Sequence, residues 1–439
     1  MAEKLLAILF SLTILVQGWL VGARAGTWLL PGSIFGFFWF LYTFIPLVAL
    51  PAVPANPMAV AYIAVCAMLF SVSSLMFDWS GALKENISRE QRVDFDSGFI
   101  RLIFWSFSSL TLVSIFINWS IQGLSLIDLM TKPLETANRF VYRKYSGLLV
   151  PNFFATLSVV LVYPSVILGG LIFGSRRSGK SRAYVLFVAL LPAVLVILAE
   201  GNKGSLPLVL VLCWAGVLIT RINDGRPVLL GNGFFRQGAA IVLLFAPLVL
   251  VAFLARGLSN LEDFELIVEF LGTMFASYTF GHLYAFADWF SSYTGQVSLM
   301  TYEPMYSTAG FYTFMPVYEL FALGKEVPPG IYEEYFNYRE MFETNIYTAF
   351  RGLITDFGLG GGLVIVTCLG AFAHGAAYRV VGFRHAPIAT AIYAHGIGFC
   401  YYSFGLSLFV WDSIYASVLL VAAVLLMNGW LTRPVARRS

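Results

Sequence analysis

Charged residues are scarce in this chain. Of its 439 residues, 12% are charged and 59% are hydrophobic, and the net charge is only +3. Soluble domains carry about 25% charged residues, so a chain this poor in charge cannot coat a water-facing surface. The composition predicts an all-α polytopic membrane protein. The same scarcity of charge argues against nucleic acid as a partner.

Motifs of soluble enzymes and of metal sites are also missing. The 4 cysteines lie inside apolar runs and none belongs to a CxxC pair, so neither a disulfide framework nor a zinc site is indicated. The patterns HExxH and GxSxG do not occur. The triplet DFD at 94–96 resembles the acidic pair that holds a metal in nucleotide-sugar transferases. A solvated charge run is the simpler interpretation if residues 78–98 face the cytoplasm. If they face the other side, the triplet would favour a metal-dependent lipid-sugar transferase.

Long apolar windows are what the chain has in place of charge. A helix needs about 20 apolar residues to cross a bilayer. Eleven windows of this kind lie at 4–22, 28–50, 57–77, 99–121, 147–174, 184–200, 204–220, 237–256, 358–379, 387–410 and 412–431. The first window resembles a signal peptide but lacks a small-residue cleavage site, so we expect a retained helix. The windows divide the chain into a transmembrane bundle (1–256), a large loop (257–357) and C-terminal helices (358–439).

The distribution of Lys and Arg predicts the orientation. Four basic stretches agree on one face, the cytoplasm: 175–183, 221–236, 379–385 and 433–439. The loop 257–357 then faces the periplasm. The N-terminal half is less consistent, because 122–146 is net positive and 78–98 net negative, the reverse of what alternation predicts. Either an early span is miscounted or 122–146 carries its cations for another purpose.

The large loop is rich in aromatic residues. Apolar residues recur at helical spacing over 260–292 with acidic residues between them, which predicts helices lying in the membrane interface. The tyrosines and phenylalanines of the loop have two interpretations. They anchor the loop among lipid headgroups, or they stack on sugars. Internal repeats are not apparent, which argues against transporters built from paired halves.

Cations at the predicted outer ends of spans are the first candidates for chemistry. They are Arg256, Arg351, Lys203, Arg139 and Arg143. A guanidinium is a planar fork suited to phosphate and pyrophosphate, whereas headgroup anchoring is the plainer role for any one of them. Several such cations at one outer face favour an anion-binding site.

Candidate bases are few. Asp356 follows Arg351 by five residues, so an ion pair between them is an alternative to a catalytic carboxylate. His282 is either a proton acceptor or an amphipathic filler among aromatic residues. His395 lies within a span, as a packing residue or a proton-path residue. Tyr347 precedes Arg351 by four residues and would share its helical face.

An ordered set of segments resembles the O-antigen polymerases, the oligosaccharide repeat-unit polymerases of bacterial envelopes. The segments are GNKGS (201–205), ARGLSN (255–260), SYTFGHLYAFADWF (277–290), AGFYTFMPVYELF (309–321) and TNIYTAFRGLITDFGLGG (344–361). The resemblance implies a GT-C-like helix bundle of about 11–12 spans in the bacterial inner membrane. It implies that undecaprenyl-pyrophosphate-linked glycans serve as donor and acceptor at the periplasmic face. Neither a nucleotide sugar nor a metal is expected in that family, so we expect no cofactor.

Under this resemblance the candidate residues take specific roles. Arg256 and Arg351 would neutralise the departing pyrophosphate, and His282 or Asp356 would act as the general base. The substrate-binding candidates are Lys203, Arg143, Tyr347 and Tyr278. Membrane lipids are further partners, and a chain-length regulator is another. Two other functions stay open: an O-antigen ligase-like glycan transferase, and a lipid-linked oligosaccharide flippase or transporter.

Overall fold

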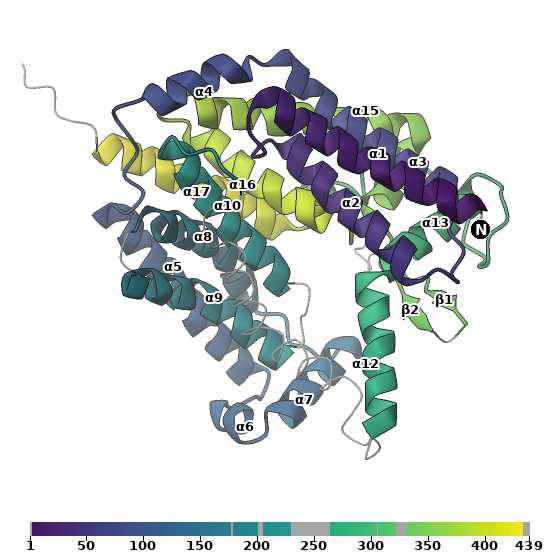
Figure 1. Ribbon diagram of the computed structural model, residues 1–439. Helices are drawn as coiled ribbons and strands as arrows, with labels where there is room; N and C mark the ends of the chain where they lie inside the picture. Colours follow the sequence, from purple (N-terminus) through teal and green to yellow (C-terminus); the bar gives the residue numbers. More distant parts are fainter. Residues whose placement is uncertain are drawn as a thin grey trace, which may run out of the picture. The chain divides into compact units, whose positions relative to one another are not determined.

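The regular structure in the described part of the chain is helical, apart from one short hairpin (Figure 1). The computed structural model describes residues 2–176, 179–200, 205–229, 264–304, 306–321, 332–339 and 341–432. Its helices are α1 (Ala2–Ala25), α2 (Pro31–Ala49), α3 (Pro57–Val72), η1 (Ser73–Met76), α4 (Trp79–Ser88), α5 (Gly98–Ile121), α6 (Leu126–Thr131), α7 (Pro133–Tyr145), α8 (Phe153–Ser175), α9 (Gly179–Glu200), α10 (Ser205–Asn223), α12 (Phe264–Thr279), α13 (Gly281–Tyr293), α14 (Met315–Leu320), α15 (Thr348–Gly382), α16 (Pro387–Tyr402), η2 (Leu408–Val410) and α17 (Asp412–Leu431). The strands β1 (Phe336–Tyr338) and β2 (Phe342–Thr344) pair antiparallel.

Eight helical stretches in the described part of the chain are long and apolar enough to cross a membrane. They are Ala2–Ala25, Pro31–Ala49, Pro57–Met76, Gly98–Ile121, Phe153–Ser175, Leu206–Asn223, Thr348–Gly382 and Asp412–Leu431. Each coincides with a predicted window, which confirms the all-α polytopic membrane class. The window 184–200 falls in α9, which is helical but is not among the eight. The window 387–410 is interrupted, because α16 ends at Tyr402 and a turn follows. The window 237–256 lies outside the described residues.

The chain divides into two compact units. The first contains Met1–Lys84, Gly272–Arg379 and Gly396–Tyr415, and the second contains Glu85–Leu271, Val380–His395 and Ala416–Ser439. Both units are therefore assembled from segments far apart in the sequence. This division differs from the three consecutive parts that the apolar windows predict.

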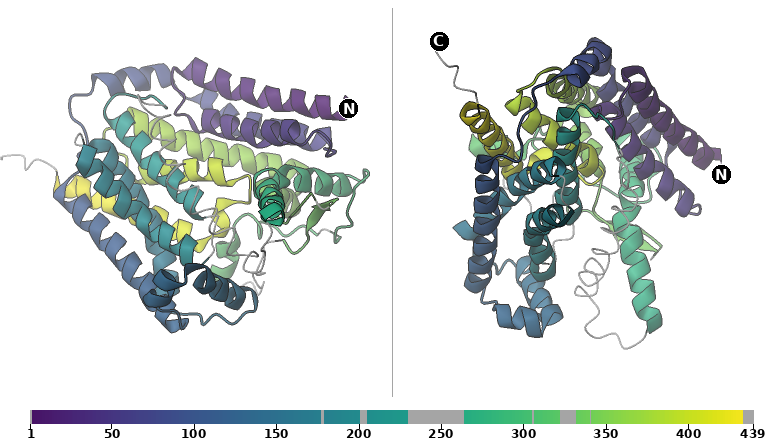
Figure 2. Two further views of the ribbon diagram at one scale, coloured as in Figure 1. Left: turned by 60° about the horizontal axis from the view of Figure 1, so that its bottom comes forward. Right: turned by 60° about the vertical axis from the view of Figure 1, so that its left-hand side comes forward.

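Small residues bring α1 close to α2 in the first unit (Figures 1 and 2). The buried stripe of α1 includes Ala7, Ser11, Gly18 and Gly22. A Cβ placed on Gly18 would lie 3.2 Å from the Cα of Gly36, which is the close backbone approach that small residues permit between membrane helices. The opposite side of α1 exposes large apolar residues such as Leu5, Leu9 and Val16. A helix that is apolar on both its buried and its exposed sides is suited to lipid.

The second unit packs α5, α8, α9 and α10 together. Hydrogen bonds join its connecting segments at one end of these helices. Arg176 donates to Asp96 at 3.1 Å, and the backbone N–H of Val93 donates to the side chain of Asn223 at 3.0 Å. The amide of Asn86 donates to the carbonyl of Val381 at 3.0 Å. The acidic segment 78–98 therefore shares an end with the basic segments 175–183, 221–229 and 379–385, as alternation of the spans predicts.

The helix α13 lies in the core of the first unit. Every residue from Gly281 to Ser291 is buried, and α13 packs against α2, α3 and the β1–β2 hairpin. The predicted interfacial helix over 260–292 is therefore corrected for this half. The sequence pattern is ambiguous, because aromatic residues with one acid occur both at a membrane interface and in a core where the acid is fully hydrogen-bonded. The preceding helix α12 does expose apolar side chains, among them Leu266, Val268 and Phe275.

The helix α15 is interrupted near its start. Gly358 has φ 70° and ψ 176° inside it, a backbone region that is essentially restricted to glycine. The short segment before Gly358 carries Arg351 and Asp356, and the long segment after it forms the predicted span 358–379. The glycine thus separates the candidate site from the membrane helix that follows.

Candidate functional site

Arg351 lies at the start of α15 and inside the first unit. The helix opens at Thr348, which has a φ of 69° and accepts a hydrogen bond from the backbone N–H of Phe350 at 3.3 Å. Arg351 follows within one turn and is only 4% exposed. Its Nη2 donates to Oε2 of Glu334, which precedes β1. The guanidinium is therefore paired with a carboxylate and is not presented to lipid.

Four aromatic rings surround the guanidinium carbon of Arg351. The ring centroids of Tyr347 and Tyr332 lie 4.1 and 4.2 Å from it. Those of Trp289 and Tyr302 lie 5.2 and 5.7 Å from it. Aromatic faces attract a cation through the ring quadrupole, by about 0.5–2 kcal/mol each. The Arg351 cluster, as we use the term below, consists of Arg351, Glu334, Trp289, Tyr302, Tyr332 and Tyr347.

Two guanidinium nitrogens of the Arg351 cluster are unused. Nε and Nη1 of Arg351 are buried and have no hydrogen-bond partner in the part of the chain that the structure describes. A buried donor left unpaired costs about 1–3 kcal/mol, and more when it is charged. The cluster therefore has the capacity for up to three further hydrogen bonds, one from Nε and two from Nη1. Acceptor oxygens of a phosphate or a sugar would satisfy both nitrogens.

The phenols of the cluster add no negative charge at neutral pH. Burial raises the pKa of Tyr347 to about 12, although the charge of Arg351 opposes that shift. Burial also raises the pKa of Tyr332 and of Tyr302 well above the usual value. An anion that approached Arg351 would therefore meet neutral hydroxyl groups and no phenolate.

Asp288 holds one wall of the cluster in place. Its carboxylate accepts hydrogen bonds from the hydroxyl of Ser298 at 2.9 Å and from the backbone N–H of Leu299 at 2.7 Å. It accepts another from the backbone N–H of Met300 at 3.2 Å, and the hydroxyl of Tyr302 donates to it at 2.8 Å. Four donors on one carboxylate fix the loop after α13, so the Tyr302 ring is positioned beside the guanidinium before any ligand binds.

Asp356 does not form the ion pair with Arg351 that its spacing suggests, and it binds a neighbouring loop instead. Its carboxylate accepts hydrogen bonds from the hydroxyl of Thr308, from the backbone N–H of Tyr312 at 3.1 Å and from the hydroxyl of Thr313 at 2.6 Å. Among the described residues no ion pair joins it to Arg351, which is paired with Glu334 instead. Asp356 thus fastens the loop before α14 to α15, and three donors occupy its oxygens.

His282 is also engaged away from the cluster. Its ring is fully buried in α13, and Nε2 donates to the backbone carbonyl of Tyr42 at 3.0 Å. The rings of Tyr42 and Phe404 meet it edge to face. Burial lowers the pKa of His282 to about 4, so the imidazole is neutral at pH 7. Within the described ranges, no hydrogen bond or ring contact joins it to the Arg351 cluster.

The other sequence candidates are distributed over both units. Arg143 belongs to the second unit and donates to the backbone carbonyl of Gln122. Arg139 forms an ion pair with Glu135 at 3.3 Å. Tyr278 is half-buried on α12. Lys203 and Arg256 lie outside the described residues.

The structure brings Arg351 and Tyr347 together, but not on one helical face as predicted, because α15 begins only at Thr348 and Tyr347 precedes it. Glu334, Trp289 and Tyr332 were missed by the sequence analysis, and Tyr302 was only one of many loop aromatics. The stretch YEEYF at 332–336 carries the signal that could have found two of them, because acids among aromatic rings suit a cation. Within the described part of the chain, no group of three His, Cys, Asp or Glu side chains could hold a metal ion.

Comparison with known proteins adds no relative to this picture. No family model, no curated protein and no solved structure matches the chain. The Arg351 cluster is therefore interpreted from its own geometry.

Proposed function

We propose that this protein is a membrane glycosyltransferase that joins undecaprenyl-pyrophosphate-linked oligosaccharide units at the periplasmic face of the bacterial inner membrane. One observation carries the proposal: Arg351 is buried in an aromatic cage with two donors that have no partner in the described residues. A diphosphate supplies the acceptor oxygens that these donors need.

The proposed reaction transfers the growing glycan from its carrier. A hydroxyl of the acceptor sugar attacks the anomeric carbon of the donor, and a carbon–oxygen bond forms as the bond from that carbon to the diphosphate breaks. Arg351 stabilises the negative charge that develops on the departing diphosphate. In the structure Glu334 occupies the guanidinium, and its side chain is 26% exposed. Once the diphosphate has replaced Glu334 on Arg351, the Glu334 carboxylate acts as the general base and accepts the proton of the attacking hydroxyl.

Topology supports the side of the membrane on which this would occur. Segments 78–98, 175–183 and 379–385 meet at one end of the second unit. The Lys and Arg content of 175–183 and 379–385 favours the cytoplasm for that end. The helix α15 has Arg351 in its first turn and ends just before the basic turn 383–385. A chain that crosses the membrane once between these points would present Arg351 to the periplasm.

The test is product formation by the full-length protein in lipid nanodiscs with the cognate lipid-linked unit. We expect Arg351→Gln to abolish the ladder of longer glycans. Arg339→Gln is the matched control, because it removes an exposed cation in the turn between β1 and β2 and should leave the ladder intact. An unaltered ladder in folded Arg351→Gln protein would overturn the proposal. Products formed only when lipid A–core acceptor is supplied would favour the ligase instead.

A further inference from the structure

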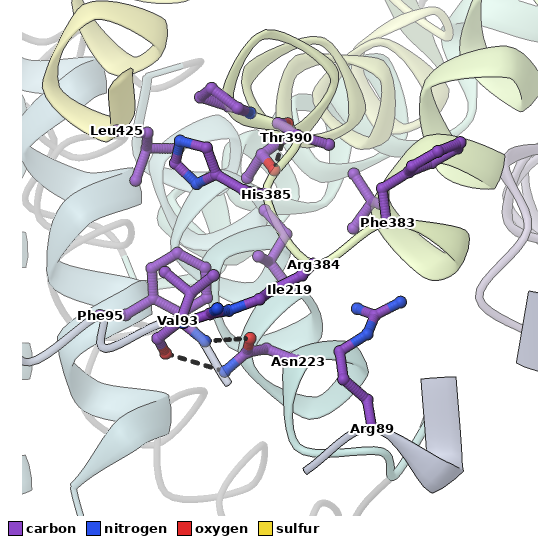
Figure 3. Close-up of a pocket in the computed structure, with 13 residues that line it drawn as sticks. Arg89, Val93, Phe95, Ile219, Asn223, Phe383, Arg384, His385, Thr390 and Leu425 are labelled. Carbon is purple, nitrogen blue, oxygen red and sulfur yellow. Dashed lines mark hydrogen bonds between the residues drawn. The ribbon is translucent and has the colours of Figure 1, made fainter. Parts of the chain in front are cut away.

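A small basic pocket lies in the second unit, and none of its lining residues belongs to the Arg351 cluster. It has a volume of about 30 Å³, and the turn 383–387 meets there the segment after α4 and the end of α10 (Figure 3). Arg89, Arg384 and His385 line it together with Asn223 and Thr390, and Phe383 stands at its edge. No Asp or Glu is among its lining residues, all of which belong to the described chain.

Hydrogen bonds between distant segments build the pocket. The side-chain amide of Asn223 both donates to the carbonyl of Val93 and accepts from its N–H, each at 3.0 Å (Figure 3). Arg89 donates to the carbonyl of Val381 at 3.3 Å, at the end of α15. Arg384 donates to the side chain of Gln91. Both guanidinium groups are therefore anchored through one edge, so they are positioned without being neutralised.

Positive charge accumulates around this space. Arg89 and Arg384 make no ion pair within the part of the chain that the structure describes. Burial lowers the pKa of Arg89; Glu85 opposes the shift, and the charges of Arg92 and Arg384 add to it. Nη1 of Arg92, beside them, is buried and has no partner among the described residues. Like charges held this close are stabilised by an anion between them.

We propose that this pocket binds one phosphate-class anion through Arg89, Arg384 and His385. Arginine is the side chain whose donors match phosphate oxygens. The pocket is small, so its scale suits a single phosphoryl group better than a sugar or a nucleobase. The binding chemistry is the same whether the phosphoryl group belongs to a lipid headgroup or to free phosphate.

The surroundings favour a lipid headgroup as the source. Phe383 is 56% exposed, Ile388 is 57% exposed and Ile87 is 60% exposed. Exposed apolar side chains beside a basic pocket are the composition of a membrane–water interface. Basic pockets at the cytoplasmic ends of membrane helices bind anionic headgroups. The basic end of the second unit has this character whether or not the Arg351 cluster transfers a glycan.

The experiment measures binding by the purified full-length protein. Native mass spectrometry would count retained phosphatidylglycerol and retained phosphatidylcholine, and phosphorus NMR would follow the line width of inorganic phosphate. The variants are Arg384→Gln, at an exposed turn position that leaves the fold intact, and the double variant Arg89→Gln/Arg384→Gln. Arg379→Gln is the control, because it removes an exposed cation of α15 that does not line the pocket.

We expect phosphatidylglycerol to be retained in preference to phosphatidylcholine by wild type and by Arg379→Gln. The single variant should bind it at least threefold more weakly, and the double variant at least tenfold. Broadening of the phosphate line that depends on Arg89 and Arg384, without a lipid preference, would identify free phosphate as the ligand. Equal retention of both lipids and an unbroadened phosphate line in wild type would overturn the proposal. So would binding that the folded double variant retains in full.

Discussion

The ion pair between Arg351 and Glu334 makes a quantitative prediction about stability. Glu334→Gln removes the one carboxylate on a guanidinium whose side chain is 5% exposed. Removing one partner of a buried pair costs about 3–5 kcal/mol, because the other charge stays buried and unpaired. Arg351→Gln is expected to lose less stability from the unpaired charge that remains, because the Glu334 side chain is 26% exposed and water can solvate it. It also loses the contacts with four aromatic rings, at about 0.5–2 kcal/mol each.

The double variant Arg351→Gln/Glu334→Gln separates structure from chemistry. It removes both charges, so its stability should lie closer to wild type than the sum of the two single losses. We expect a coupling of about 2–3 kcal/mol between the two positions. Glycan transfer should nevertheless stay absent, because the double variant still lacks the guanidinium.

The assay is unfolding in mixed micelles with increasing dodecyl sulfate, followed by circular dichroism for all four proteins of the cycle. Strict additivity of the two single losses would refute the pairing on which the magnitude rests. A double variant that is stable and fully active would show that the pair has only a structural role.

Two further predictions concern the same unit. Gly358→Ala should destabilise the protein by about 1–3 kcal/mol, because residues with a Cβ strongly disfavour φ 70° with ψ 176°. The control is Gly360→Ala, where a Cβ meets nothing within 4 Å. It should be neutral or stabilising by about 0.5–1 kcal/mol. Equal effects of the two changes in the same unfolding assay would contradict the assigned break. His282 has its pKa lowered from 6.5 to about 4, so the unfolded chain takes up a proton that the folded chain refuses, and stability should fall by about 3 kcal/mol between pH 6.5 and pH 4. His282→Gln should flatten that part of the pH profile, and a slope unchanged from wild type would assign it to other groups.

Hydropathy was a reliable guide to the spans and a poor one to the loop. The windows located eight membrane-length helices because a bilayer demands about 20 apolar residues whatever lies around them. The hydropathy pattern also placed the start of the span 358–379 at the glycine that interrupts α15. Composition could not distinguish α13 from an interfacial helix. Burial of its one acid, Asp288, is possible because four donors satisfy the carboxylate, and they come from 10 to 14 residues further along the chain.

The candidate site shows the same limit. Helical spacing predicted that Tyr347 and Arg351 share a face, and it suggested Asp356 as the ion-pair partner. The two residues do lie together, but Tyr347 stands before the first residue of α15. The ion-pair partner of Arg351 is Glu334, 17 residues earlier and outside α15. Helical periodicity carries no information about which loop returns to cover a helix end. The pairing could only be seen once the segments 288–302, 332–338 and 347–356 were in place.

The interruption at Gly358 also has a consequence for how α15 fits its surroundings. A straight helix of 35 residues would be about 52 Å long at 1.5 Å per residue. A bilayer with its headgroups is about 40–45 Å thick, so such a rod would either tilt steeply or push its first turns into open water. By ending one helical axis and starting another, the glycine lets the first ten residues leave the direction of the span. Polar residues on these ten positions can then lie beside the membrane without lengthening the segment that crosses it.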